Sequence, residues 1–146
     1  MNLKYQNLEV WKLAYAFVLK IYGVVEKFPA IEDNNLTSQL RRATTCLPLN
    51  IAEGSGARSP KIFLTYLVFA YRSSKEIETC LMLARDLKYL SLEEFDNLWN
   101  DLNKFEGKLY SYMEYLEKDV GERKRDLTFH YRQKREVIKE DLSKFA

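Results

Sequence analysis

Residues 91–116 read SLEEFDNLWNDLNKFEGKLYSYMEYL, and this stretch decides the fold. Its apolar residues recur every three or four positions, which places them on one face of an α-helix. Almost all of the remaining positions are polar. Ser91 and Glu94 form a capping box at the start of the stretch. We therefore predict a peripheral helix over residues 92–119 with one buried seam, which consists of Phe95, Leu98, Leu102, Phe105, Leu109, Tyr112 and Leu116.

Three more helices are predicted upstream, over residues 7–28, 34–55 and 60–89. The first ends before Pro29, because the residue before a proline disfavours the α region. The third begins after Ser59, which is the expected N-cap. Glycine and proline, at five and three residues, are too scarce for a protein rich in sheet turns. The fold class is therefore all-α, an antiparallel up-down four-helix bundle.

The second helix contains a proline and should begin near Asn34 or Asn35. Pro48 removes one backbone N–H and crowds the carbonyl of Thr44, so we expect a kink at this point. Asn50 lies on the inward seam, where its amide can satisfy a carbonyl that the kink frees.

The end of the same helix contains a carboxylate and two glycines. Glu53 lies one turn after Asn50 and is placed to pair with an arginine, such as Arg42 or Arg72. Gly54 or Gly56 suits a left-handed C-cap, which ends the helix.

Two of the predicted helices carry more apolar surface than one bundle buries. Residues 7–28 show two apolar stripes, and residues 62–71 are apolar at nine of ten positions. Large apolar surface left exposed marks an interface. We therefore expect self-association through Val10, Phe17, Ile21, Val24, Phe63, Tyr66 and Phe69. The alternative is that the C-terminal tail folds back over the second stripe.

The composition, 47% hydrophobic and 30% charged, is that of a globular domain. The apolar run from Ile62 to Tyr71 is half of the roughly 20 residues that span a bilayer, and no signal peptide follows Met1. We expect a cytoplasmic protein without membrane contact. Cys46 and Cys80 lack CxxC spacing and neighbouring histidines, so we expect reduced core residues.

Positive charge gathers near the C-terminus: residues 1–119 carry a net charge of −1, and residues 120–146 one of +3. We divide the chain into a bundle over residues 1–120 and a basic, marginally helical tail over residues 121–146. Basic residues interleaved with aromatic ones are typical of nucleic-acid binding. The alternative is a charged run that only keeps the protein soluble. The candidates in the tail are Arg123, Lys124, Arg125, Arg132, Lys134 and Arg135.

A second basic group surrounds the second and third helices and consists of Arg41, Arg42, Arg58, Lys61 and Arg72. If these residues share a face, they form a patch that attracts phosphate. An ordinary solvated surface is the alternative, and the net charge of −1 over residues 1–119 supports it.

Nothing in the sequence supports catalysis. His130 is the only histidine, which excludes sites built from paired histidines. No Glu-x-x-His motif of a di-metal bundle is present, and the glycines at residues 54–56 lack the lysine and spacing of a phosphate loop. We expect no catalytic residues, no metal and no cofactor.

Three motifs resemble one protein family. LEVWKLA at residues 8–14, LTSQLRRA at residues 36–43 and PLNIAEG at residues 48–54 are similar, in order and spacing, to the 23S ribosomal RNA intervening-sequence proteins. A later pattern between residues 59 and 90 also fits. The resemblance covers about residues 3–118.

The resemblance implies a four-helix bundle that assembles as a homopentamer with a central channel, encoded within bacterial ribosomal RNA loci. A related branch, the accessory protein of diversity-generating retroelements, binds nucleic acid and partners a reverse transcriptase. No catalytic residues carry over. The resemblance implies a role in fold and assembly for Arg41, Arg42, Asn50, Glu53 and Gly54. This chain departs from the family pattern in its non-basic bundle and in its charged extension after Gly121.

Two functions fit these observations. The first is a non-enzymatic, oligomeric accessory protein that binds nucleic acid through its basic residues, with RNA as the expected nucleic acid. The second is an oligomeric scaffold that binds a protein partner without contacting nucleic acid. Salt-sensitive binding separates them, because phosphate contacts weaken steeply with salt.

Overall fold

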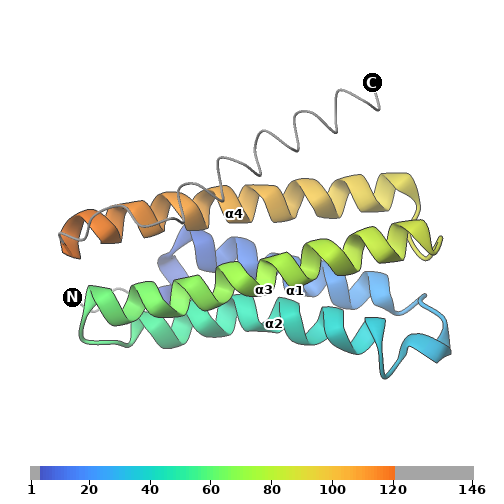
Figure 1. The fold of residues 1–146 in the computed structure, drawn as a ribbon, viewed down its shortest axis with the longest axis horizontal. Coiled ribbons are helices and arrows are strands. Elements are labelled where there is room, and N and C mark those ends of the chain that lie inside the picture. Colours follow the sequence, from blue (N-terminus) through green and yellow to red (C-terminus); the bar gives the residue numbers. More distant parts are fainter. Residues whose placement is uncertain (1–3, 121–146) are drawn as a thin grey trace.

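The structure, a computed structural model, describes residues 4–120, and these residues form a bundle of four α-helices without a strand (Figure 1). The predicted all-α four-helix bundle is confirmed. In chain order the elements are η1 (Tyr5–Asn7), α1 (Glu9–Val25), η2 (Ala30–Glu32), α2 (Leu36–Ser55), α3 (Pro60–Asp86) and α4 (Leu92–Val120), where η marks a 3-10 helix.

Local sequence signals set two of the helix starts as predicted. Ser59 caps α3, because its side chain accepts a hydrogen bond from the Ile62 N–H at 3.4 Å. Ser91 and Glu94 form the capping box of α4, with both reciprocal hydrogen bonds at 3.1 Å. These bonds satisfy N–H groups that have no partner within the first turn of a helix.

The start of α2 differs in its capping group. Asn35 occupies the N-cap position but makes no side-chain capping bond. The carboxylate of Glu32 instead accepts from the Leu36 N–H and from the Asn35 side chain, each at 3.1 Å. The η2 turn places Glu32 directly before the helix, so its negative charge also meets the positive end of the α2 dipole.

Two helix ends differ from the prediction as well. Gly56 follows α2 with a φ of −78°, so the expected left-handed glycine cap is wrong there. The left-handed residue is Lys88, with a φ of 66°, and α3 ends at Asp86. The Tyr89 N–H donates to the Ala84 carbonyl at 2.8 Å, which is the pattern of a Schellman motif.

The core runs along the axis of the bundle, and α2 packs most extensively against α3. The predicted seam of α4 lies inside, with Leu102, Phe105 and Leu109 fully buried. Tyr112 is only half-buried, and Met113 takes the inward position beside it. Along its outer edge α4 is joined to α1 by two exposed ion pairs, Lys20–Asp101 at 2.5 Å and Lys27–Glu94.

Gly54 lies inside α2 at the closest approach of α2 and α3. A Cβ atom added there would lie 2.6 Å from the Tyr66 Cβ and 2.7 Å from the Phe63 Cδ2. Distances that short do not occur between such atoms, so only glycine fits while α3 stays where it is. The sequence suggested Gly54 as a helix end, but its role is to let two helices touch.

We predict that Gly54→Ala destabilises the bundle by about 1–3 kcal/mol, because the added methyl group overpacks the α2–α3 contact. Gly23→Ala is the matched control, since nothing lies within 4 Å of a Cβ added in the exposed helical position of Gly23. That control should gain about 0.5–1 kcal/mol from higher helix propensity. Urea unfolding of both variants measures the difference, and equal shifts for the two would refute the close approach.

Candidate functional site

The basic residues predicted in the bundle do not form one cluster. Arg41 and Arg42 lie in the first half of α2, whereas Arg58 and Lys61 lie at the turn between α2 and α3. With a rise of 1.5 Å per residue, Arg42 is about 20 Å along the helix from that turn. Arg72 is exposed on α3, one turn from Glu76. A single phosphate-binding patch is therefore not assembled from these five residues.

The structure brings Arg41 together with an aromatic ring that the sequence did not suggest. The Arg41 guanidinium lies 5.6 Å from the ring centroid of Tyr22, which comes from α1 and is 42% exposed. Neighbouring Arg42 donates a hydrogen bond to the Gln39 side chain at 2.6 Å. Arg41 is thus held against α1, while Arg42 points to solvent.

The candidate residues of the tail lie outside residues 4–120, the part of the chain that the structure describes: Arg123, Lys124, Arg125, Arg132, Lys134 and Arg135.

The predicted interface residues of α1 need a correction. Val10, Phe17 and Ile21 are at most 4% exposed and belong to the core of their own bundle. Of the two apolar stripes on α1, the one that faces outward contains Tyr15 and Tyr22. The physical reason is the tyrosine hydroxyl, which needs a hydrogen-bond partner when it is buried and finds water at the surface.

The predicted interface residues of α3 also lie partly in the core and partly at the surface. Phe63 is 9% exposed and belongs to the core, so its assignment to an interface is wrong. Tyr66 is partly buried, as is Val24 of α1, and Phe69 is 43% exposed. The large apolar side chains that α1, α2 and the first half of α3 do expose are Tyr15, Leu19, Tyr22, Leu49, Ile62 and Phe69, which we call the outer apolar residues.

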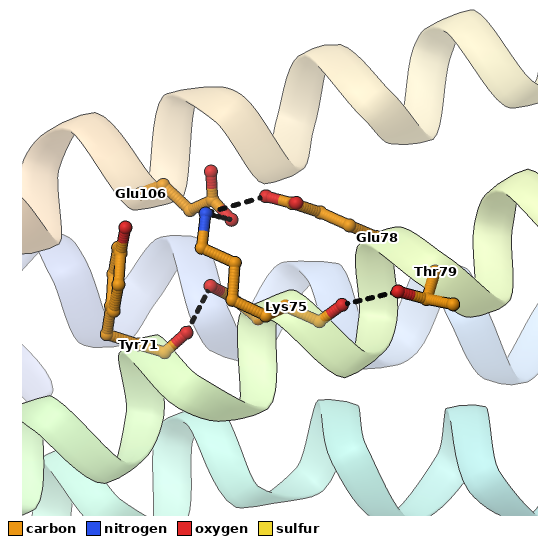
Figure 2. A network of polar contacts seen from close by, with 6 residues as sticks. Tyr71, Lys75, Glu78, Thr79 and Glu106 are labelled. Atoms are coloured by element: carbon orange, nitrogen blue, oxygen red, sulfur yellow. Dashed lines mark hydrogen bonds and ion pairs between the residues drawn. The ribbon is translucent and has the colours of Figure 1, made fainter. Parts of the chain in front are cut away.

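A buried carboxyl group links α3 and α4 (Figure 2). Glu106 of α4 is 1% exposed, and its Oε1 lies 4.0 Å from the Lys75 Nζ. The same ammonium lies 3.2 Å from the Glu78 Oε1 and 4.7 Å from the ring centroid of Tyr71. Lys75 therefore stands between two carboxylates and the face of a ring.

Burial raises the pKa of Glu106 to about 7, and the charge of Lys75 and a hydrogen bond from Ser74 offset only part of this rise. A carboxyl group that titrates near neutral pH resembles a general acid. A substrate needs contact with such a group, however, and the side chain of Glu106 is closed off inside the helix packing. The network therefore acts on stability rather than on a bound molecule.

Residues 6–111 match the 23S rRNA-intervening sequence proteins, and this match spans most of the chain. The chain belongs to this family. No curated protein matches the sequence.

A solved structure from Bacteroides thetaiotaomicron, described as a protein with unknown function from the S23 ribosomal protein family, has the same fold with a TM-score of 0.66. The two sequences are 24% identical, and the match covers 71% of this chain and 97% of that chain. At this identity the likeness shows the fold alone.

The motif residues Pro48, Asn50 and Glu53 of this 23S rRNA-intervening sequence protein lie in the second half of α2. α2 runs through Pro48 as one helix, and the Asn50 amide donates to the Cys46 carbonyl at 2.8 Å. The amide therefore serves the backbone around the proline, although not the Thr44 carbonyl that the proline leaves without its usual donor. Glu53 is exposed and forms no ion pair with Arg42 or Arg72 in the described part of the chain, so that expected pairing is wrong.

No signal in the sequence predicts the buried carboxyl group. Glu106 directly follows Phe105 of the predicted seam and reads as one of many polar residues on α4. Lys75 and Glu78 of α3 are both half-buried and face α4. Only the packing of α3 against α4 shows that these charges meet, because no spacing within one helix relates them.

We predict that Glu106→Gln removes a pH dependence of stability. The carboxyl ionises at about 7 in the fold and near 4.5 when unfolded, so the free energy of unfolding falls as pH rises from 4.5 to 7. At pH 8 the variant should be more stable than the parent by about 1–3 kcal/mol. Glu76→Gln, an exposed carboxyl on α3, is the control and should keep the parental profile. Urea unfolding at several pH values measures this, and parallel profiles for parent and Glu106→Gln would contradict it.

Proposed function

We propose that this protein is a non-enzymatic, self-associating accessory protein that binds nucleic acid, with RNA as the expected ligand. The observation that carries the proposal is the match of residues 6–111 to the 23S rRNA-intervening sequence proteins, a family named for an RNA. The gathering of positive charge in residues 120–146, with a net of +3, supports it. We place this role in the cytoplasm. No helix within residues 4–120 has the length and apolar character to cross a membrane.

Nucleic-acid binding is proposed to rest mainly on the tail, with smaller contributions from the bundle. The bundle has a net charge of −1 over residues 1–119, and its basic residues are spread along two helices. Contacts with phosphate need a local excess of positive charge, and residues 120–146 carry such an excess. Arg41 and Arg42 at one end and Arg58 at the other would extend the contact along α2.

The proposal assigns no catalytic step. The carboxyl with the pKa nearest neutrality, Glu106, is shielded from any substrate. Within residues 4–120, no group of three His, Cys, Asp or Glu side chains lies close enough to hold a metal ion. Cys46 and Cys80 are both free thiols, which suits a reducing compartment.

Self-association is proposed to use the outer apolar residues. Tyr15, Leu19 and Leu49 are each at least half exposed, and such side chains on adjacent helices favour an interface. The outward face of α4 is largely polar between Leu92 and Tyr115, which suits a helix that faces solvent. The number of subunits, five, comes from the family resemblance.

A second function, a scaffold that binds a protein partner without nucleic acid, is favoured by one observation. The bundle combines a net charge of −1 with an exposed apolar surface, and such a surface suits a protein partner better than phosphate. The two functions differ in their response to salt.

We predict that truncation after Val120 weakens RNA binding and lowers the slope of log affinity against log salt by about one for each lost phosphate contact. The double variant Arg42→Gln/Arg58→Gln, which keeps the tail, is the comparison and should lose less. Fluorescence anisotropy with a short unstructured RNA measures both, and circular dichroism shows that each protein is folded. Unchanged binding after truncation would move the site to the bundle, and salt-independent or absent binding by the full chain would favour the scaffold.

We predict that the chain of 17.3 kDa forms a pentamer in solution and that Leu19→Glu lowers the mass. A carboxylate at a buried contact is costly, which separates the subunits. Leu92→Glu is the control, because Leu92 is 72% exposed at the start of α4 and lies outside the proposed interface. Light scattering coupled to chromatography gives the mass. A stable monomer of the parent chain would defeat self-association, and a dimer would defeat the pentamer alone.

A further inference from the structure

A groove lies between the start of α1 and the last third of α4. It is almost entirely apolar, has a volume of about 270 Å³, and is lined by Leu8, Glu9, Val10, Lys108, Ser111, Tyr112 and Tyr115. None of its lining residues belongs to the outer apolar residues.

Two tyrosines of α4 shape the groove. The rings of Tyr112 and Tyr115 stack with centroids 6.2 Å apart and an interplanar angle of 13°. Phe63 meets the other side of Tyr112 edge-on at 5.6 Å and so fixes that ring from the core. Burial raises the pKa of the Tyr112 hydroxyl, whereas Tyr115 is 58% exposed. The groove thus has a fixed floor and an aromatic wall open to solvent.

The chain itself continues next to this groove. α4 ends at Val120, which lies about 7 Å along the helix from Tyr115 and about 12 Å from Tyr112. Figure 1 shows that this end of α4 and the start of α1 lie toward the same end of the bundle. Gly121 comes next, and glycine permits the chain to reverse its direction at that point.

The sequence after Gly121 places apolar side chains at the right distance. Residues 122–126 are all charged, and Leu127, Phe129 and Tyr131 follow. Seven extended residues reach about 23 Å, which exceeds the distance back to Tyr112. The segment 127–131 is therefore the first part of the chain beyond Val120 that combines reach with apolar character.

We infer that residues 127–131 of the same chain dock in the groove, with an aromatic side chain of this segment on the open face of Tyr115. Aromatic pairs of this kind add stability beyond the area that they bury. Docking in this way leaves the flanking basic residues at the surface, so it does not depend on RNA binding and adds to the proposed function.

Charge around the groove favours this occupant. Glu9 and Lys108 both line the groove, so the lining itself is balanced in charge. The end of α4 next to it carries Glu114, Glu117 and Asp119 against Lys118. Asp126 directly precedes the segment, residues 123–125 before it are all basic, and Arg132 follows it. Opposite charges on the two surfaces orient the segment as it approaches.

Tethering favours the chain's own segment over that of a second copy. A segment joined by a short linker has an effective concentration in the millimolar range at its own groove. Separate molecules at micromolar concentration compete poorly with it. The inference is therefore docking within one chain, and exchange between chains is a distinct outcome of the test.

The test is the rate of trypsin cleavage after Arg125 and Arg132 in the full chain, followed by mass spectrometry. Docking should slow cleavage of the parent by about tenfold relative to Tyr115→Ser and Phe129→Ser, since burial of one aromatic ring corresponds to a ratio of that order. Leu92→Ser on α4 and Phe145→Ser near the C-terminus are the matched controls and should cleave like the parent. Circular dichroism confirms that each variant is folded, and Phe129→Ser leaves the bundle sequence unchanged.

Three results would overturn the inference. Equal cleavage of parent and both variants means that the segment is not docked. Protection that grows with protein concentration means that the segment docks on a neighbouring chain. If Phe129→Ser is cleaved as slowly as the parent and Tyr115→Ser is cleaved faster, another segment occupies the groove. None of these outcomes depends on RNA, so the inference and the proposed function fail separately.

Discussion

The contact that the rest of the structure depends on is the approach of α2 to α3 at Gly54. Because that residue has no Cβ, Tyr66 and Phe63 of α3 pack directly on the backbone of α2. Phe63 in turn holds the edge of Tyr112 on α4, and Tyr112 is the floor of the groove. One missing methyl group thus sets the spacing of three helices and the shape of a surface on the opposite side of the bundle.

The polar network between α3 and α4 contributes in another way. A buried carboxyl group lowers stability unless charge and hydrogen bonds compensate it, and Glu106 has the Lys75 ammonium and a hydrogen bond from Ser74 to do so. Apolar seams alone tolerate a shift of one helix along another. A charge inside the seam has one favourable register, because every other register separates Glu106 from its compensating groups.

Most of the fold was predictable from local signals, and the candidate surfaces were not. The cap at Ser59, the capping box at Ser91 and the seam of α4 depend on residues a few positions apart, so the sequence displays them directly. Which of the two apolar stripes on α1 is buried depends on the helices that pack against α1, and no local signal shows this. Phe17 was therefore predicted at an interface between subunits, whereas it lies in the core. The pairing of Arg41 with Tyr22 likewise joins separate helices, which no spacing within one helix reveals.

The two ion pairs that join α1 to α4, Lys20–Asp101 and Lys27–Glu94, are exposed on one edge of the bundle. Ionic strength screens exposed pairs, whereas it leaves the buried α2–α3 contact unaffected. Rising salt therefore loosens one side of the molecule first, and the groove lies on that side. The two halves of the molecule therefore differ in their sensitivity to salt: the α2–α3 half keeps its packing, while the strength of the α1–α4 edge depends on the ionic strength of the solution.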